Sequence, residues 1–174
     1  MKRFLFLLMA VFASFHLHAQ QQASVAERFF QKYENDRNFT VVTITPKMFG
    51  MFAKLDASDP DSKNLMTVIK KLKGLRILAR ENTKDGPRLY KEASAFLGSD
   101  YEELMTVRDK TSDLKFMVKE NSRGNINELI MLVNGTDEFM VMSLVGEIDL
   151  NEISQIAGAV NIQGMDKLKN VRKK

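Results

Sequence analysis

The fold of this chain is decided by Leu129-Ile130-Met131-Leu132-Val133 and Phe139-Met140-Val141-Met142-Ser143-Leu144-Val145, two apolar runs close together in the sequence. Asn134-Gly135 stands between them, and both of its residues tolerate the positive φ angles of a tight hairpin. Apolar residues at consecutive positions are typical of strands that are covered on both faces. We therefore expect two central strands, 126–133 and 139–145, joined by a hairpin.

The residues before this pair extend the same pattern. Leu114, Phe116 and Val118 alternate with more polar positions, which predicts a strand over 114–119 with one solvated face. A further strand is expected over 101–108, where a helix over Glu102–Met105 is the rival interpretation. Because short turns join these four strands, we expect an antiparallel meander.

After the apolar runs, Gly146-Glu147-Ile148-Asp149-Leu150 indicates a change from strand to helix. Asp149 with Glu152 has the capping-box spacing, and Ile148 with Ile153 has the spacing of a hydrophobic staple. The helix is expected to end near Asn161. The remaining expected elements are helices over 24–35, 46–55, 62–73 (ended by Gly74) and 87–97, and strands over 39–45 and 75–81.

This order predicts an α+β fold. We expect an antiparallel or mixed sheet of about six strands, with helices packed on it and a four-strand meander at its C-terminal end. Residues 20–160 would form one domain, and residues 161–174 a basic tail. A chain of this length is enough for one domain with a sizeable core and too short for two.

The first nineteen residues resemble a secretory signal peptide. Lys2 and Arg3 precede an apolar run, and Leu17-His18-Ala19 is a suitable cleavage site. The apolar run is too short to span a membrane, and no later stretch predicts a transmembrane helix. We expect cleavage after Ala19 and a soluble, exported chain, periplasmic or secreted. The sequence does not choose between these compartments.

The composition excludes several partners and chemistries. Without Lys2 and Arg3 the 26 basic residues fall to 24, against 22 acidic ones, which leaves a net charge of +2. This near-neutral balance argues against nucleic acid as a partner. The chain has no Cys, and its two histidines, His16 and His18, lie in the predicted signal peptide. We therefore expect no metal site, no cofactor and no catalysis by His or Cys.

Three patterns of oxygen and amine groups remain, and a structural role explains each of them better. Glu147, Asp149 and Glu152 are candidate acids of a hydrolase, but capping and a solvated turn account for them. Ser112 and Lys115 have Ser/Lys acyl-enzyme spacing but straddle a turn and a strand, where their side chains diverge. The acidic loop 56–61 lacks the Gly and the distal Glu of a calcium-binding EF-hand loop.

The C-terminal tail is the one feature that folding does not explain. Its cations could contact anionic lipid headgroups or an acidic partner, or simply keep a frayed end in solution. These residues are Lys167, Lys169, Arg172, Lys173 and Lys174.

Several segments together resemble the exported bacterial family called domain of unknown function 4252. The resemblance is carried by Val41-Val42-Thr43-Ile44-Thr45-Pro46-Lys47-Met48, Gly74-Leu75-Arg76-Ile77-Leu78, Tyr101-Glu102-Glu103-Leu104-Met105, Glu128-Leu129-Ile130-Met131-Leu132-Val133 and Gly146-Glu147-Ile148-Asp149-Leu150. It implies a secreted or envelope protein of a Gram-negative bacterium and implies no catalytic residue. Some relatives resemble lipoproteins, and this chain departs from them because it has no Cys.

Three functions are compatible with these features. The first is a non-enzymatic exported module that binds an envelope protein or component. The second is a carrier of a small molecule or lipid, with a pocket under the Met- and Phe-rich helices 46–55 and 62–73. The third is a carboxylate-dependent hydrolase of cell-wall or glycan substrates. The missing catalytic residue types favour the first.

Overall fold

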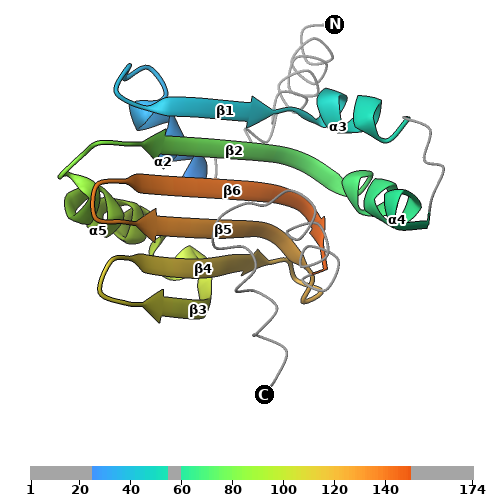
Figure 1. The fold of residues 1–174 in the computed structure, drawn as a ribbon. Helices are drawn as coiled ribbons and strands as arrows, with labels where there is room; N and C mark the ends of the chain where they lie inside the picture. Colours follow the sequence, from blue (N-terminus) through green and yellow to red (C-terminus); the bar gives the residue numbers. More distant parts are fainter. Residues whose placement is uncertain (1–24, 55–59, 150–174) are drawn as a thin grey trace, which may run out of the picture.

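The computed structural model describes residues 25–54 and 60–149 (Figure 1). In chain order, these residues form α2 (Val25–Tyr33), β1 (Thr40–Ile44), α3 (Pro46–Phe52), α4 (Pro60–Ile69), β2 (Leu72–Arg80), α5 (Gly86–Leu97), the short 3-10 helix η2 (Gly98–Asp100), β3 (Glu102–Arg108), β4 (Asp113–Glu120), β5 (Ile126–Asn134) and β6 (Phe139–Ile148). The predicted signal peptide, the predicted helix 149–161 and the basic tail lie outside the described residues, apart from Asp149 itself.

The strands form one sheet in the order β1-β2-β6-β5-β4-β3, and all neighbours are antiparallel. The expected meander of the last four strands is confirmed. Of the antiparallel and mixed arrangements, the antiparallel one is found. Two described strands lie at the edges: β1, which pairs with β2, and β3, which pairs with β4.

One face of the sheet is covered by α2 and α5, which lie behind it in Figure 1. Phe30 of α2 and Leu89 of α5 are fully buried there against strand residues such as Leu78, Leu132 and Phe139. Complete burial of one such side chain contributes roughly 1.5–3 kcal/mol. This face therefore holds a dense apolar core.

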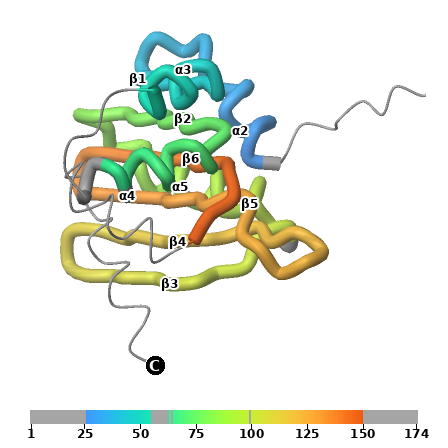
Figure 2. The backbone as a smooth tube through the Cα atoms, turned by 90° about the vertical axis from the view of Figure 1, so that its right-hand side faces the viewer, coloured from blue at the N-terminus to red at the C-terminus, as the bar shows by residue number. Residues whose placement is uncertain are grey.

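The opposite face is also apolar. Phe116, Leu129 and Met131 are fully buried on it, and Phe49 of α3 and Val68 of α4 belong to the same cluster. Figure 2, which views the end at which β1 and β6 finish, shows α3 and α4 at that end of the sheet. Both faces of the central strands are thus buried, as their consecutive apolar residues indicated.

The expected helix 62–73 is too long at its C-terminal end. α4 ends at Ile69, and the Lys70 and Lys71 amides donate to carbonyls of its last turn. Leu72 already belongs to β2, where it pairs with Gly146. Gly74 therefore lies within a strand, beside a bulge, and is not the residue that stops a helix. The helical alternative for Glu102–Met105 is also wrong, because β3 covers these residues.

The expected strand 139–145 is too short at its C-terminal end, and the helix expected after it lies outside the described residues. β6 continues to Ile148, since Leu72 of β2 and Ile126 of β5 provide pairing partners on either side. A Cβ atom on Gly146 would lie 2.7 Å from the Lys71 carbonyl oxygen. The glycine is needed for this close backbone approach.

The hairpin at Asn134-Gly135 exists, but its loop is longer than a two-residue turn. Asn134 pairs directly with Phe139, so Gly135–Glu138 form the connection. Neither Asn134 nor Gly135 adopts positive φ. The Gly135 amide closes the loop by donating to the Glu138 carbonyl.

Candidate functional site

β1 is exposed along most of its length. Val41 and Val42 keep 37% and 39% of their surface accessible. Val41 pairs with Leu78, so it shares the face of α2 and α5, whereas Val42 pairs with Ile77 on the opposite face. An edge strand also presents backbone N–H and C=O groups that its own sheet does not use. β1 thus offers backbone hydrogen-bonding groups together with an apolar side chain on either face.

Helix α3 extends this apolar surface. Thr45 separates the helix from β1 and caps it, because its hydroxyl accepts from the Met48 amide at 3.4 Å. Pro46 fits the first helical position, where its missing N–H costs nothing. Phe49 points inward, while Met48 and Met51 remain 44% and 58% exposed.

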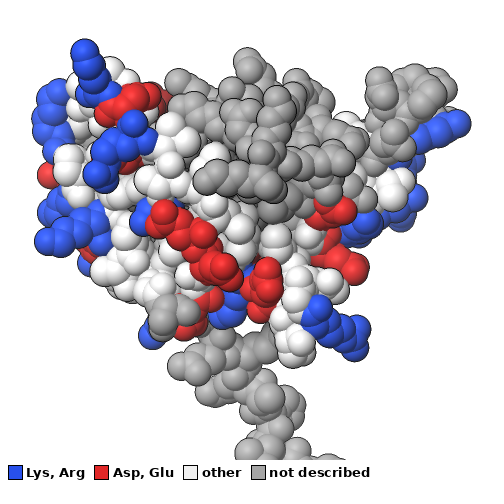
Figure 3. Space-filling model, turned by 90° about the horizontal axis from the view of Figure 1, so that it is seen from below, with Lys and Arg blue, Asp and Glu red and all other residues white. Residues whose placement is uncertain are grey.

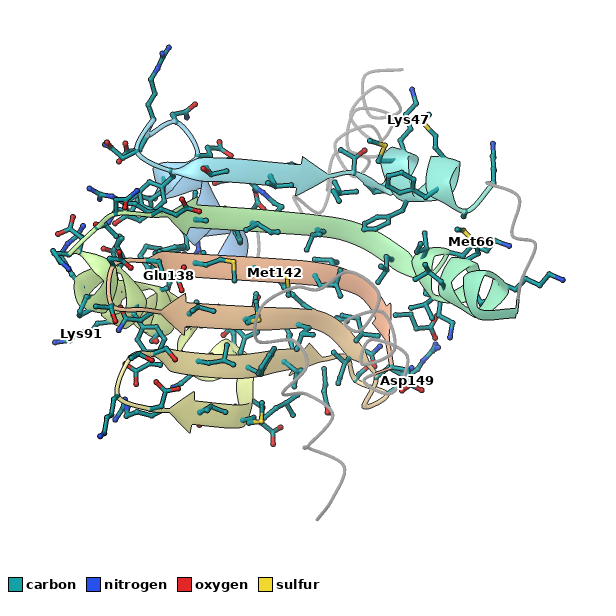
Figure 4. The ribbon with its side chains drawn as sticks, in the orientation of Figure 1. Lys47, Met66, Lys91, Glu138, Met142 and Asp149 are labelled. Carbon is teal, nitrogen blue, oxygen red and sulfur yellow. The ribbon has the colours of Figure 1, made fainter. Side chains whose placement is uncertain are left out.

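We call Val41, Val42, Met48 and Met51 the β1 edge surface. β1 contains no charged residue, but a cation stands just outside each of its ends, Arg37 before it and Lys47 after it. Both are exposed, and neither forms an ion pair with another described residue. Figure 4 shows Lys47 pointing outward past the β1 edge.

The opposite edge, β3, is built differently. Its exposed residues include Glu102, Glu103 and Arg108, and a register shift interrupts its pairing with β4. The Lys115 ammonium lies 2.8 Å from a Glu103 oxygen, and Arg108 pairs with Asp113. Figure 3 shows this side of the molecule, with acidic side chains close to basic ones. Charges and bulges of this kind discourage the addition of another strand.

These ion pairs change the acidities of their members. The hydrogen bond from Lys115 holds the pKa of the Glu103 carboxyl below its ordinary value. The hydrogen bond from Arg108 does the same for the pKa of Asp113. Both carboxyl groups therefore stay ionised, and the β3 edge stays charged, below the pH at which free carboxyl groups take up protons.

An acidic hollow lies at the end of the sheet where β6 finishes. It measures about 430 Å³ and is lined in part by Lys71, Glu120, Glu147 and Asp149. All three carboxylates are exposed. A general acid of a glycosidase needs an environment that keeps its carboxyl protonated, usually by burial. Glu152, the third expected acid, lies outside the described residues.

A buried carboxylate that the sequence analysis missed lies on β5. Glu128 is only 6% exposed, and its two oxygens accept separately from the Tyr101 and Ser143 hydroxyls, each at 2.7 Å. These bonds join the residue before β3 to the neighbouring strands β5 and β6. Full hydrogen bonding of a buried polar group is ordinary in a stable core, so we assign Glu128 a structural role.

The other expected site residues are not brought together. The Ser112 hydroxyl donates to Asp109 in the turn, whereas Lys115 pairs with Glu103, so no Ser/Lys pair forms. The side chains of the acidic loop 56–61, the candidate calcium site, lie outside the described residues. The five cations of the tail lie outside them too. Among the described residues, no group of three His, Cys, Asp or Glu is placed to hold a metal ion.

Of the three comparisons with known proteins, the one with family models finds a match. The model of the family described as Domain of unknown function (DUF4252) matches residues 33–156. The chain belongs to this family. The DUF4252 match includes all six strands, and with them the β1 edge surface and the acidic hollow. No curated protein and no solved structure matches the chain. In the part of the chain that the structure describes, no helix is long and apolar enough to cross a membrane.

Proposed function

We propose that this protein is a non-enzymatic, exported protein-binding module, periplasmic or secreted, that holds its partner at the β1 edge surface. One observation carries the proposal: β1 is an exposed edge strand with no charge, no proline and no bulge in its pairing with β2. An open edge of this kind can pair with the strands of other chains and so cause aggregation. A partner that covers the edge removes that risk.

The neighbouring helix supports a protein as the partner. Met48 and Met51 add flexible apolar side chains just beyond the C-terminal end of the strand, and methionine is common on surfaces that adapt to a bound chain. Phe49 of α3 and Val68 of α4 are buried in the core cluster beneath them. The surface therefore suits a docked chain better than an enclosed ligand.

Export is a separate part of the proposal, supported by the signal-peptide pattern of residues 1–19. We expect the mature protein isolated from the producing cells to begin at Gln20. Intact-mass measurement of protein from the cell envelope and the medium tests this. Full-length protein that stays in the cytoplasm would contradict export.

The binding role is tested by position-specific cross-linking in living cells. A photoactivatable residue at Met51, on the β1 edge surface, should yield an adduct of one discrete mass. The same residue at the exposed Thr106 of β3 is the matched control and should not yield it. Identical adduct patterns at the two positions, or no adduct at Met51, would contradict the proposed function.

A further inference from the structure

We infer that the partner supplies an extended segment that pairs with β1 as a further strand, with uncharged residues at its centre and an acidic residue at each end. This inference rests on the proposed function and specifies the occupant of the same surface. It combines two features of the described residues: an unprotected strand edge and a cation beside each of its ends.

The strand edge determines the length and the residue types of the central part of the partner segment. β1 spans five residues, from Thr40 to Ile44, which is roughly 17 Å at about 3.4 Å per residue. A strand added to this edge forms main-chain hydrogen bonds, and its alternate side chains lie beside Val41 on one face and Val42 on the other. β-Branched and other apolar residues fit these positions, whereas a charge there would be desolvated without a partner.

The flanking cations fix the two ends. Arg37 lies in the turn before β1 and Lys47 in the first turn of α3, each three residues beyond an end of the strand. The nearby Asp36 carboxylate already accepts from the backbone and side-chain nitrogens of Asn38, at 2.9 and 2.8 Å. Acidic residues at both ends of the added strand can meet the cations in either strand direction. Such rim pairs mainly set specificity and the rate of association.

The same charges argue against a second copy of this chain as the occupant. In a two-fold antiparallel pairing of two β1 strands, the end of β1 that follows Arg37 in one copy meets the end that precedes Lys47 in the other. Like charges would meet at both ends of the new pair, which is unfavourable. The chain's own C-terminal tail is also basic, with Lys173 and Lys174 at its end. A segment of a different protein therefore fits best.

Two synthetic peptides test the inference with the mature protein, residues 20–174. Both have seven residues and a centre of alternating Thr and Val, and they differ only in having Asp or Lys at both ends. Fluorescence anisotropy measures their affinities at low and at high salt. We expect the Asp-ended peptide to bind about ten-fold more tightly at low salt, and the difference to shrink at high salt.

Variants locate the binding site and test the charges. Val42→Asp should weaken binding of the Asp-ended peptide at least about ten-fold, whereas Thr106→Asp, which adds the same charge to the other edge, should leave it unchanged. The double variant Arg37→Glu/Lys47→Glu should reverse the preference toward the Lys-ended peptide. Lys91→Glu, on α5, is its control, and thermal melting verifies that every variant folds.

Several results would overturn the inference. Equal affinities of the two peptides at low salt would remove the role of the cations, and unchanged binding by Val42→Asp would place the peptide elsewhere. Sedimentation that shows a dimer dissociated by Val42→Asp would make a second copy the occupant. If neither peptide binds while Met51 still cross-links to one discrete protein, the strand-addition model is wrong and the proposed function stands. If both experiments fail, both proposals are wrong.

Discussion

The two edges of the sheet differ in how they meet solvent. β3 carries Glu102, Glu103 and Arg108, its pairing is interrupted by a bulge, and ion pairs hold its side chains against β4. β1 has an uninterrupted register with β2 and exposes Thr and Val on both faces. One edge thus has the features that prevent further strand addition, and the other lacks them.

This difference indicates where to look for binding among the described residues. Charges and bulges cost little at an exposed edge, and β3 shows that this fold accommodates them. Their absence from β1 therefore indicates that an open edge is useful there. If so, changes at β3 should affect stability and solubility, whereas changes at β1 should affect binding as well as solubility.

The largest expected effect comes from removing the buried link between β3 and the centre of the sheet. Glu128→Ala leaves the Tyr101 and Ser143 hydroxyls without their acceptor, and each unsatisfied buried group costs about 1–3 kcal/mol. We expect the free energy of unfolding to fall by about 2–4 kcal/mol, measured by urea denaturation. Glu128→Gln keeps an acceptor and should cost less. A loss below about 0.5 kcal/mol for Glu128→Ala would contradict the structural role.

A smaller effect is expected when β3 is made to resemble β1. The triple variant Glu102→Thr/Glu103→Val/Arg108→Thr removes the charges of that edge. We expect its solubility, the highest concentration at which the protein stays in solution, to fall several-fold, because a second open edge allows association. Light scattering during concentration measures this. The reverse change, Val42→Lys, should raise the solubility, and an unaltered solubility in both variants would show that the charges do not protect β3.

The smallest expected effect is the pH dependence of the β3 edge. Because the folded-state pKa of Glu103 is lowered, the Glu103–Lys115 pair stabilises the fold above the unfolded-state pKa of Glu. That stabilisation is lost as pH falls through the lowered folded-state value. Glu103 is largely exposed, so we expect less than about 1 kcal/mol. Urea denaturation of Glu103→Gln and the wild type should converge at low pH. A difference that grows on acidification would contradict this assignment.

The turn between β3 and β4 gives a sharper test of the same kind. Asp109 accepts from the Thr111 and Ser112 amides at 2.8 and 2.9 Å, and these bonds lower its pKa to about 2. NMR titration should therefore find Asp109 still ionised at pH 3. An ordinary pKa near 4 would mean that these turn hydrogen bonds do not persist in solution.

Local sequence signals were enough to predict the strands and their meander. Strands joined by short turns usually pair with each other, so the order of β3 to β6 in the sheet can be predicted from apolar patterns and turn residues. The family could be predicted too, because core and turn segments distributed over most of the chain carried the resemblance.

The candidate site could not be predicted in this way, because its features depend on non-local pairing. A Val- and Thr-rich strand reads alike at the edge and in the centre of a sheet, and only the partners of β2 show that β1 lies outside. Gly146 resembled the end of a strand. It is instead a position where the backbone of Lys71, far away in sequence, comes too close to leave room for a side chain. Glu128 is buried because Tyr101 and Ser143 reach it from other strands or their ends.

Hydrogen–deuterium exchange with the Asp-ended peptide in excess tests most directly whether β1 is the binding edge. The β1 amides that point away from β2 have no partner in the sheet, so they should exchange fast in the unbound protein and slowly once an added strand accepts their hydrogen bonds. We predict new protection confined to residues 40–44, with residues 102–108 unchanged. Protection gained at 102–108, or at neither edge, would contradict the assignment of β1 as the open edge and β3 as the closed one.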